Sequence, residues 1–262
     1  MHKVSFIGGG NMAAAIIGGL IASGAQPTDI EVVEINADAR AQLAARFGVV
    51  THSDLSQARL HPLIVLAVKP QILPEVAAAL ATKLAGQLVV SIAAGVRVAD
   101  LARWLGGHNR IVRAMPNTPA LVQAGVTGLF APAAVSPDAR SQAEAVLRAV
   151  GGVVWVDDET LLDAVTAVSG SGPAYVFYCI ESLEAAALAQ GLAPATARQL
   201  ALQTFFGAAK LALESGEEPA LLRQRVTSKG GTTERGIAAL EAAAVKSAFG
   251  QAVDAASRRS AE

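Results

Sequence analysis

Three small residues near the start of the chain have the spacing of a phosphate-binding turn. Residues 4–7 are apolar for the most part, and Gly8, Gly10 and Ala13 then fit the pattern G-x-G-x-x-G/A. Gly8 permits a tight turn, Gly10 lets a pyrophosphate approach the backbone, and Ala13 allows close packing of the following helix on the strand. The N-terminus of that helix offers amides to phosphate oxygens. The pattern therefore predicts a dinucleotide site and hydride-transfer chemistry.

The ribose of such a dinucleotide is expected beside Glu34. Asn11 and Met12 complete the phosphate-binding turn, and Glu34 ends the second predicted strand. A carboxylate at this place accepts both ribose hydroxyls but repels a phosphate, which favours NADH over NADPH. Asn36 and Arg40 lie nearby in the sequence and partly offset the negative charge. The alternative interpretation of Glu34 is a solvent-exposed residue at a strand end.

Further candidate cofactor contacts follow three later strands. In open α/β folds, ligands bind where strands end. The candidates are Ala67, Val68, Lys69 and Pro70 after one strand, Ala93 and Ala94 after the next, and Asn117 after a third. We expect the two alanines and the loop at residues 116–118 to flank the nicotinamide ring, with Asn117 bonding its carboxamide. Each segment taken singly also fits an ordinary loop.

A second group of candidate residues lies far along the chain. It is the run Ser228-Lys229-Gly230-Gly231-Thr232-Thr233, which opens the last predicted helix. The free amides and the partial positive charge of a helix N-terminus make a cradle for a carboxylate. The hydroxyls of Ser228, Thr232 and Thr233 add hydrogen-bond donors. A plain threonine N-cap is the alternative interpretation, and it uses the same amides.

The elements that position these residues divide the chain in two. Strands and helices alternate over residues 1–157, which predicts a Rossmann dinucleotide-binding domain with a mostly parallel, doubly wound sheet. Only helices are predicted over residues 158–262, the substrate-binding and dimerisation domain. Strands are predicted at residues 3–7, 30–34, 63–67, 88–92, 111–114, 127–130 and 153–156. Helices are predicted at residues 12–23, 38–47, 73–84, 98–105, 137–150, 159–168, 173–190, 194–215, 218–226 and 233–249, with a frayed tail at 258–262.

Composition narrows the classes of partner. Helices in the second half are rich in alanine and apolar on several sides, which predicts an intertwined dimer. The net charge is −1, so neither nucleic acid nor an anionic membrane is an expected partner. A single cysteine, Cys179, excludes internal disulfides and cysteine-based metal clusters, and the four histidines have no ligand spacing. We therefore expect no metal, a buried thiol at Cys179 and a cytoplasmic protein.

These segments, in this order and spacing, resemble the pyrroline-5-carboxylate reductase family over essentially the whole chain. The most specific runs are residues 113–119, 168–175 and 230–233. The resemblance implies a helical domain of the 6-phosphogluconate dehydrogenase type and a swapped dimer, often assembled into a decamer. It also implies reduction of L-1-pyrroline-5-carboxylate to L-proline, the last step of proline biosynthesis.

The resemblance extends to single residues. It implies that Thr233 is the catalytic group that bonds the ring nitrogen, that Gly230, Gly231 and their neighbours bind the substrate, and that Glu159 lies near the same pocket. Family members commonly carry a small hydroxyl or amide residue where this chain has Glu34, which suits the 2′-phosphate of NADPH. Glu34 therefore departs from the family pattern.

Two alternatives stay open at this point. One is a related dehydrogenase that acts on a hydroxyacid or on another cyclic imine. No lysine occurs between Lys83 and Lys210, although hydroxyacid dehydrogenases of this plan use one as acid and base. The other alternative is a non-catalytic protein that senses a nucleotide. The intact run at residues 230–233 argues against it, because a sensor need not keep a substrate pocket.

Overall fold

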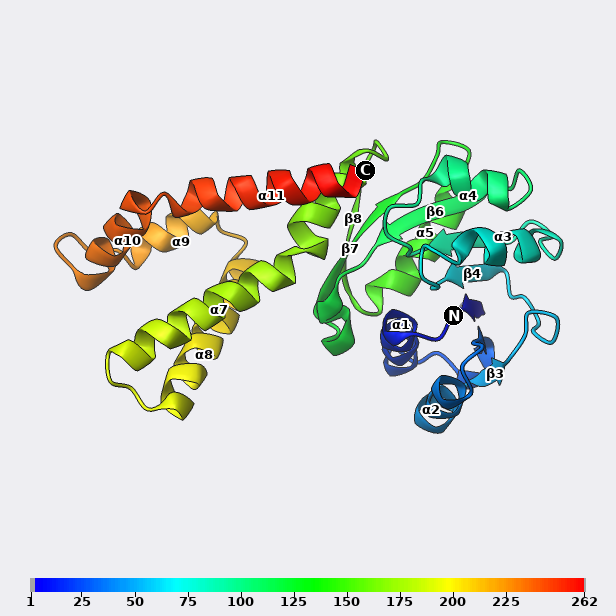
Figure 1. Ribbon diagram of the computed structural model, residues 1–262, viewed down its shortest axis with the longest axis horizontal. Helices are drawn as coiled ribbons and strands as arrows, with labels where there is room; N and C mark the ends of the chain where they lie inside the picture. The colour runs from blue at the N-terminus through cyan, green and yellow to red at the C-terminus, as the bar shows by residue number, and fades with distance from the viewer. Residues whose placement is uncertain (1–2, 262) are drawn as a thin grey trace. The chain divides into compact units, whose positions relative to one another are not determined.

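The protein is described by a computed structural model that covers residues 3–261 (Figure 1). Its contacts divide the chain into two compact units. The sheet unit comprises residues 3–171 and 256–261, and the helical unit comprises Gly172–Ala255. The division falls beyond the predicted boundary at residue 157, because helix α6 (Leu161–Val165) packs against strand β7 of the sheet. A functional boundary at residue 157 stays a prediction.

Eight strands form one sheet in the order β3-β2-β1-β4-β5-β6-β7-β8. All neighbouring pairs are parallel except β6 and β7, which confirms the predicted mostly parallel sheet. The chain crosses from β3 to the far side of β1 before it continues with β4, so the order reverses beside β1. The strands are β1 (Val4–Ile7), β2 (Ile30–Val33), β3 (Val50–His52), β4 (Leu63–Leu66), β5 (Leu88–Ser91), β6 (Ile111–Met115), β7 (Gly125–Phe130) and β8 (Gly151–Trp155).

Helices cover both faces of this sheet, as a doubly wound fold requires (Figure 1). Successive side chains of a strand point to opposite faces, so Val65 packs on one side and Ile64 and Leu66 on the other. Both sides are covered, and this explains why the central strands are continuous apolar runs. One face carries α1 (Asn11–Ala22), α2 (Ala37–Phe47) and α5 (Pro137–Arg148). The other face carries α3 (Leu73–Ala81) and α4 (Val98–Trp104).

Strand β3 and the connection after β6 differ from the sequence prediction. Strand β3 was not predicted, because it has three residues at the sheet edge and its first residue, Val50, is 41% exposed. Short 3-10 turns, η1 (Pro27–Asp29) and η2 (Thr118–Val122), precede β2 and β7. The helix predicted at residues 159–168 is α6 followed by a π-helical turn, η3 (Thr166–Gly170). None of these differences removes a strand of the predicted central sheet.

The helical unit departs from prediction at its last element. The single helix predicted at residues 233–249 is wrong, since a turn at Ala243 and Ala244, with Ala244 at φ 54°, separates two helices. The tail predicted as frayed is helical as far as Ala261, and Glu262 lies outside the described residues. The helices are α7 (Gly172–Ala189), α8 (Pro194–Ser215), α9 (Pro219–Arg225), α10 (Thr232–Ala242) and α11 (Val245–Ala261), whose last residues belong to the sheet unit. None of the described helices has both the length and the apolarity needed to cross a bilayer.

A buried histidine in the sheet unit has a lowered pKa. His61, just before β4, is 4% exposed, and its Nε2 has no hydrogen-bond partner among residues 3–261. Burial lowers the pKa of His61. Glu31 and Asp29 oppose this shift, whereas Arg59 and Lys3 reinforce it. The folded protein therefore holds His61 neutral at a pH where an unfolded chain would bind a proton.

We expect stability to fall as the pH drops below about 6.5, the ordinary pKa of histidine. Below this pH, His61 of the unfolded chain binds a proton more readily than His61 of the folded protein, so the free energy of unfolding falls. His61→Leu removes the group that takes up the proton and fills the buried position with an apolar side chain. Urea unfolding at about pH 7.5 and about pH 5.5 measures the effect, and the variant should lose less stability on acidification. An equal loss in both proteins would contradict this role of His61.

Candidate active site

The predicted cofactor contacts meet at one edge of the sheet. Gly8 follows β1, Glu34 follows β2, Ala67 follows β4, Ala93 lies just beyond β5, and Asn117 lies just beyond β6. These strands are parallel, so their carboxyl ends lie along the same edge. The order of strands reverses there between β1 and β4, which is where open α/β folds bind ligands.

The glycine turn after β1 has the geometry that a dinucleotide needs. Gly8 adopts φ +101°, and a Cβ there would lie 2.6 Å from the carbonyl oxygen of Ala67. Gly10 is the N-cap of α1, makes no side-chain cap and has no atom within 4 Å of a Cβ position. The buried Ala13 lets α1 approach the sheet, Met12 packs against the core, and Asn11 is exposed. The turn therefore fits a pyrophosphate at an uncapped helix N-terminus.

Glu34 contacts the glycine turn directly. Its Oε2 accepts a hydrogen bond from the amide of Gly9 at 2.8 Å, and its Oε1 accepts one from the amide of Asn36 at 2.8 Å. Arg40 does not pair with this carboxylate in the structure; its Nη1 donates to the carbonyl oxygens of Glu34 and Ile35. The carboxylate is half-buried against the turn, so it is not a freely solvated strand-end residue.

The later loops contribute backbone and small side chains to this edge. Val68 and Pro70 are half-buried, Lys69 is exposed, Ala93 is 4% exposed and Ala94 is exposed. The expectation that Ala93 and Ala94 flank the nicotinamide ring stays a prediction. Their individual contacts with a cofactor stay predictions.

Asn117 has a supporting role that the sequence did not reveal. Its side chain is 8% exposed, its Oδ1 accepts from the amide of Val126 at 2.9 Å, and its Nδ2 donates to the carbonyl of Ser169 at 3.0 Å. The side chain therefore joins the loop after β6 to β7 and to η3. One hydrogen of Nδ2 and one lone pair of Oδ1 are left for the predicted bond to a nicotinamide carboxamide, and that bond stays a prediction.

The run at residues 228–233 lies in the helical unit and turns into α10. Gly230 has φ +74° and donates its amide to Glu234 Oε2 at 2.7 Å. Gly231 donates its amide to the carbonyl of Ser228 at 3.0 Å. The amides of both glycines are thus engaged within the turn, which corrects the expectation that all of them are free to bind a carboxylate. The reason is local, because a left-handed glycine folds the chain back on itself.

Thr232 and Thr233 are the part of this cradle that remains open. They are the first two residues of α10, and no side chain caps the helix at its N-cap, Gly231. Both threonines and Ser228 are exposed. Their amides and hydroxyls are therefore the groups of the first turn of α10 that are candidates for the predicted cradle.

Glu159 belongs to the sheet unit, whereas residues 228–233 belong to the helical unit. Its Oε1 accepts hydrogen bonds from the amide of Val98 at 2.8 Å and from Nη1 of Arg113 at 3.1 Å. Arg113 is only 4% exposed, so it is a buried partner. The substrate contact that the resemblance implies for Glu159 would compete with these bonds and stays a prediction. Sequence reasoning missed this pairing, because the partners of Glu159 lie 46 and 61 positions away in the chain and no local pattern records them.

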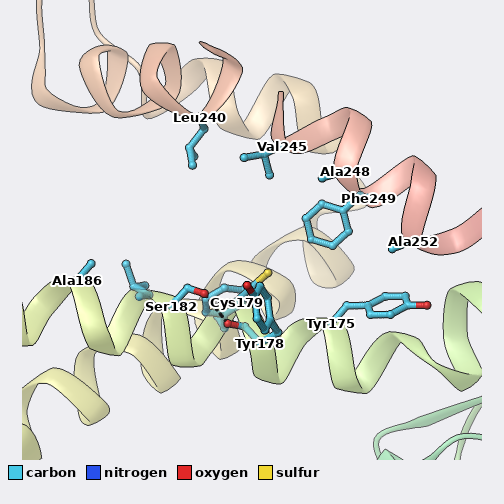
Figure 2. Close-up of a pocket in the computed structure, with 12 residues that line it drawn as sticks. Tyr175, Tyr178, Cys179, Ser182, Ala186, Leu240, Val245, Ala248, Phe249 and Ala252 are labelled. Carbon is cyan, nitrogen blue, oxygen red and sulfur yellow. Dashed lines mark hydrogen bonds between the residues drawn. The ribbon is translucent and has the colours of Figure 1, made fainter. Parts of the chain in front are cut away.

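An apolar groove runs along the helical unit (Figure 2). It has a volume of about 660 Å³, and α7 faces α10 and α11 across it. Cys179 lines the groove and is partly exposed, so the expected burial of this thiol does not occur within one chain. The lining residues are Tyr175, Tyr178, Cys179, Ser182, Leu183, Ala186, Phe205, Leu240, Val245, Ala248, Phe249 and Ala252.

Other helix surfaces of this unit are also apolar and exposed. Phe177 on α7 is 62% exposed, and Phe206 and Leu213 on α8 are 64% and 85% exposed. Among the residues of Gly172–Ala255, only Ala197 and Ala201 are buried. The helical unit of a single chain therefore has almost no core of its own. Within residues 3–261, no three His, Cys, Asp or Glu side chains are arranged to hold a metal ion.

The fold and the site define a class of protein, the dinucleotide-dependent oxidoreductases. The defining features are a doubly wound, mostly parallel sheet, an uncapped glycine turn and an acidic residue after β2. The family follows from comparison with known proteins. Residues 159–262 match the family model for pyrroline-5-carboxylate reductase dimerisation, and residues 3–95 match that for NADP oxidoreductase, coenzyme F420-dependent.

Relatives of known name agree over the full length. The chain is 48% identical to the pyrroline-5-carboxylate reductase of Pseudomonas aeruginosa, over 99% of this chain and 96% of that protein. It is 43% identical to the same enzyme of Escherichia coli, over 91% and 90% of the two chains. The chain therefore belongs to the pyrroline-5-carboxylate reductase family, as its motifs predicted.

Solved structures support the same placement. The pyrroline-5-carboxylate reductase of Coxiella burnetii has a TM-score of 0.96 at 45% identity, covering 99% of this chain and 97% of that one. The pyrroline carboxylate reductase of Plasmodium falciparum, solved with NADP bound, has a TM-score of 0.86 at 29% identity, covering 99% and 97%. The predicted fold, a Rossmann domain followed by a helical domain, is confirmed.

Two glycine substitutions separate cofactor binding from folding. Gly10→Ala adds a methyl group into open space at ordinary backbone angles, so we expect an unchanged melting temperature and cofactor binding weaker by at least about tenfold. Gly8→Ala strains a left-handed turn against Ala67, so we expect a lower melting temperature. Thermal unfolding and titration of NADH fluorescence measure the two effects. Tight cofactor binding by Gly10→Ala would contradict the assigned pyrophosphate position.

Proposed function

We propose that this chain reduces L-1-pyrroline-5-carboxylate to L-proline, the last step of proline biosynthesis. The observation that carries the proposal is the uncapped first turn of α10, formed by Thr232 and Thr233, in a chain 48% identical to a reductase of that name. A bound reduced nicotinamide supplies a hydride to the imine carbon. The C=N bond is thereby reduced to C–N, the nicotinamide is oxidised, and the ring nitrogen holds a proton.

The residues of the chain mainly bind and orient the substrate. The amides of Thr232 and Thr233 and the positive end of α10 hold its carboxylate, so no dedicated arginine is needed. The Thr233 hydroxyl hydrogen-bonds the ring nitrogen and thereby orients the imine carbon. A protonated imine accepts hydride readily, so correct placement supplies most of the rate enhancement. Small residues such as Ala93 and Ala94 leave room for the ring that donates the hydride.

Thr233→Ala tests the reaction and the role of the hydroxyl together. With NADH and L-1-pyrroline-5-carboxylate, we expect the original protein to oxidise NADH. We expect kcat to fall about 100-fold in the variant, the size expected when the reacting carbon is no longer held in place. The cofactor KM should stay unchanged, because Thr233 lies away from the glycine turn in the sequence and in a different unit.

Thr233→Ser is the matched control, since it keeps the hydroxyl and should restore most of the activity. An unchanged kcat in Thr233→Ala would rule out the hydroxyl role while leaving the reaction standing. Absence of NADH and NADPH oxidation by the original protein would rule out the reaction. Activity on piperideine-6-carboxylate alone would point instead to another cyclic imine as the substrate.

We further propose that NADH is preferred over NADPH. The Glu34 carboxylate lies against the glycine turn and can accept the ribose hydroxyls, whereas a 2′-phosphate would meet its negative charge. At an effective dielectric constant of about 20, two unit charges about 4 Å apart interact by about 4 kcal/mol. Arg40, held on the carbonyl oxygens of Glu34 and Ile35, offsets this repulsion only in part.

Two substitutions of Glu34 test this preference. We expect Glu34→Ser to raise the ratio of kcat/KM for NADPH to that for NADH by at least about tenfold, which corresponds to about 1.4 kcal/mol. Glu34→Gln keeps the size and the acceptor for Gly9 but removes the charge, so it should shift the ratio in the same direction. Better use of NADPH than of NADH by the original protein would refute the proposed preference.

We also propose that the helical unit forms a homodimer with a second copy. Its groove and the exposed faces of α7 and α8 are apolar, and one chain buries almost none of this surface. The match of residues 159–262 to a dimerisation family supports the same partner. Light scattering at micromolar concentration should give at least the mass of a dimer, and a monomer mass would contradict the proposal. Assembly into a decamer and a cytoplasmic location stay predictions.

A further inference from the structure

Two carboxylates, Glu159 in the turn before α6 and Asp163 within α6, bind the loop that leads into α4. Oε1 of Glu159 accepts from the amide of Val98 at 2.8 Å and from Nη1 of Arg113 at 3.1 Å. Oδ2 of Asp163 accepts from Nη2 of Arg97 at 2.5 Å. Nη1 of Arg97 also donates to the carbonyl oxygen of Glu159 at 3.2 Å. We call Arg97, Arg113, Glu159 and Asp163 the α6 ion cluster.

The α6 ion cluster is largely withdrawn from water and electrically balanced. The side chains of Arg113 and Asp163 are 4% and 8% exposed, and those of Glu159 and Arg97 are 19% and 30% exposed. Two carboxylates face two guanidinium groups, so the charges cancel. A displaced member would leave an unpaired charge in a poorly solvated place, and this penalty holds each member in its position.

The loop at residues 92–97 depends on this cluster at one of its ends. At its start, the amide of Ile92 donates to the carbonyl of Leu66 at 3.1 Å, so the sheet holds that end. Gly95, at φ +75°, turns the chain in the middle. At its far end, Arg97 and the amide of Val98 are held by Asp163 and Glu159. Ala93 and Val96 pack into the core, and the contacts with Asp163 and Glu159 hold the far end of the loop.

We propose that Arg97, Asp163 and Glu159 are positioning residues for the nicotinamide end of the cofactor site, because they hold the loop that carries Ala93 and Ala94. This inference rests on the proposed function, which places the nicotinamide ring beside these alanines. In this role Glu159 acts through the loop. A displacement of about 1 Å between reacting groups can cost about 100-fold in rate, so support of this loop matters to hydride transfer.

The end of the chain takes part in the same cluster. Ser260, in the last turn of α11, donates from its Oγ to Oδ1 of Asp163 at 2.9 Å. Both carboxylate oxygens of Asp163 therefore have partners, one from the loop before α4 and one from α11. Loss of the Ser260 hydroxyl should loosen Asp163 and, through Arg97, the loop at residues 92–97.

Arg97→Gln is the principal test, with Arg103→Gln as its matched control. Arg97 is the N-cap residue of α4, whereas Arg103 lies within α4 and pairs with Asp100 on an exposed face. With kcat expressed per cofactor-binding site, we expect Arg97→Gln to lower kcat about tenfold, because the loop moves relative to the reacting ring. The Kd of NADH should change by less than about threefold, because the glycine turn binds the pyrophosphate independently. Arg103→Gln should change neither quantity.

Hydrogen–deuterium exchange gives a second, independent readout. Exchange of residues 92–98 should become faster in Arg97→Gln and Asp163→Asn but not in Arg103→Gln. A lower melting temperature with an unchanged kcat per site would overturn the proposal, since it would show a role in stability alone. An equal fall of kcat in Arg103→Gln would overturn it as well.

Ser260→Ala decides the matter if the cluster variants do not fold. It removes one hydrogen bond at the edge of the cluster, so we expect about a threefold lower kcat and faster exchange at residues 92–98. Unchanged kcat and exchange would overturn the proposal. If the original protein does not reduce L-1-pyrroline-5-carboxylate, the proposed function fails separately. NADH binding should then still slow exchange of residues 92–98 in the original protein and less so in the Ser260→Ala variant, and equal slowing would overturn the positioning role.

Discussion

The close approach of the first strand-to-helix turn to the neighbouring strand is the constraint on which the cofactor site depends. At Gly8 the chain passes so near the carbonyl of Ala67 that a Cβ would lie 2.6 Å away, and the backbone is left-handed. A tight turn is the result, and it brings the bare N-terminus of α1 to the carboxyl edge of the sheet. Because the central strands are parallel, Glu34 and the later loops are delivered to that same edge.

The helical unit obeys a different constraint, which is the lack of an internal core. Helices normally bury one apolar stripe against their own domain. Among residues 172–255, only Ala197 and Ala201 are buried, while large side chains such as Phe206 and Leu213 stay exposed. In the proposed dimer, the second copy covers this surface, and the stability of the unit then depends on protein concentration. The substrate cradle proposed at Thr232 and Thr233 belongs to this unit, so the proposed function links substrate binding to folding and association.

Long-range polar contacts connect the loops after β5 and β6 to α6 and η3. Asn117 reaches Ser169 across 52 positions, and Arg97 reaches Asp163 across 66 positions. Several residues that the sequence presents as candidate ligand contacts thus have protein partners in the structure. Glu159 is an example, because its carboxylate joins Arg113 to the first amide of α4.

The sequence by itself determined the doubly wound sheet, the helical second half, the glycine turn and the family, because each of these has a local pattern. Apolar runs, glycine spacing and helix starts depend on residues close together in the chain. Only the tertiary structure shows that β3 lies at the sheet edge and that Ala244 divides the last predicted helix. It also shows that the amides of Gly230 and Gly231 donate hydrogen bonds within their own turn. It alone paired Asp163 with Arg97 and Ser260. The partners of a buried charge are chosen by the packing of distant segments, and no local pattern records that choice.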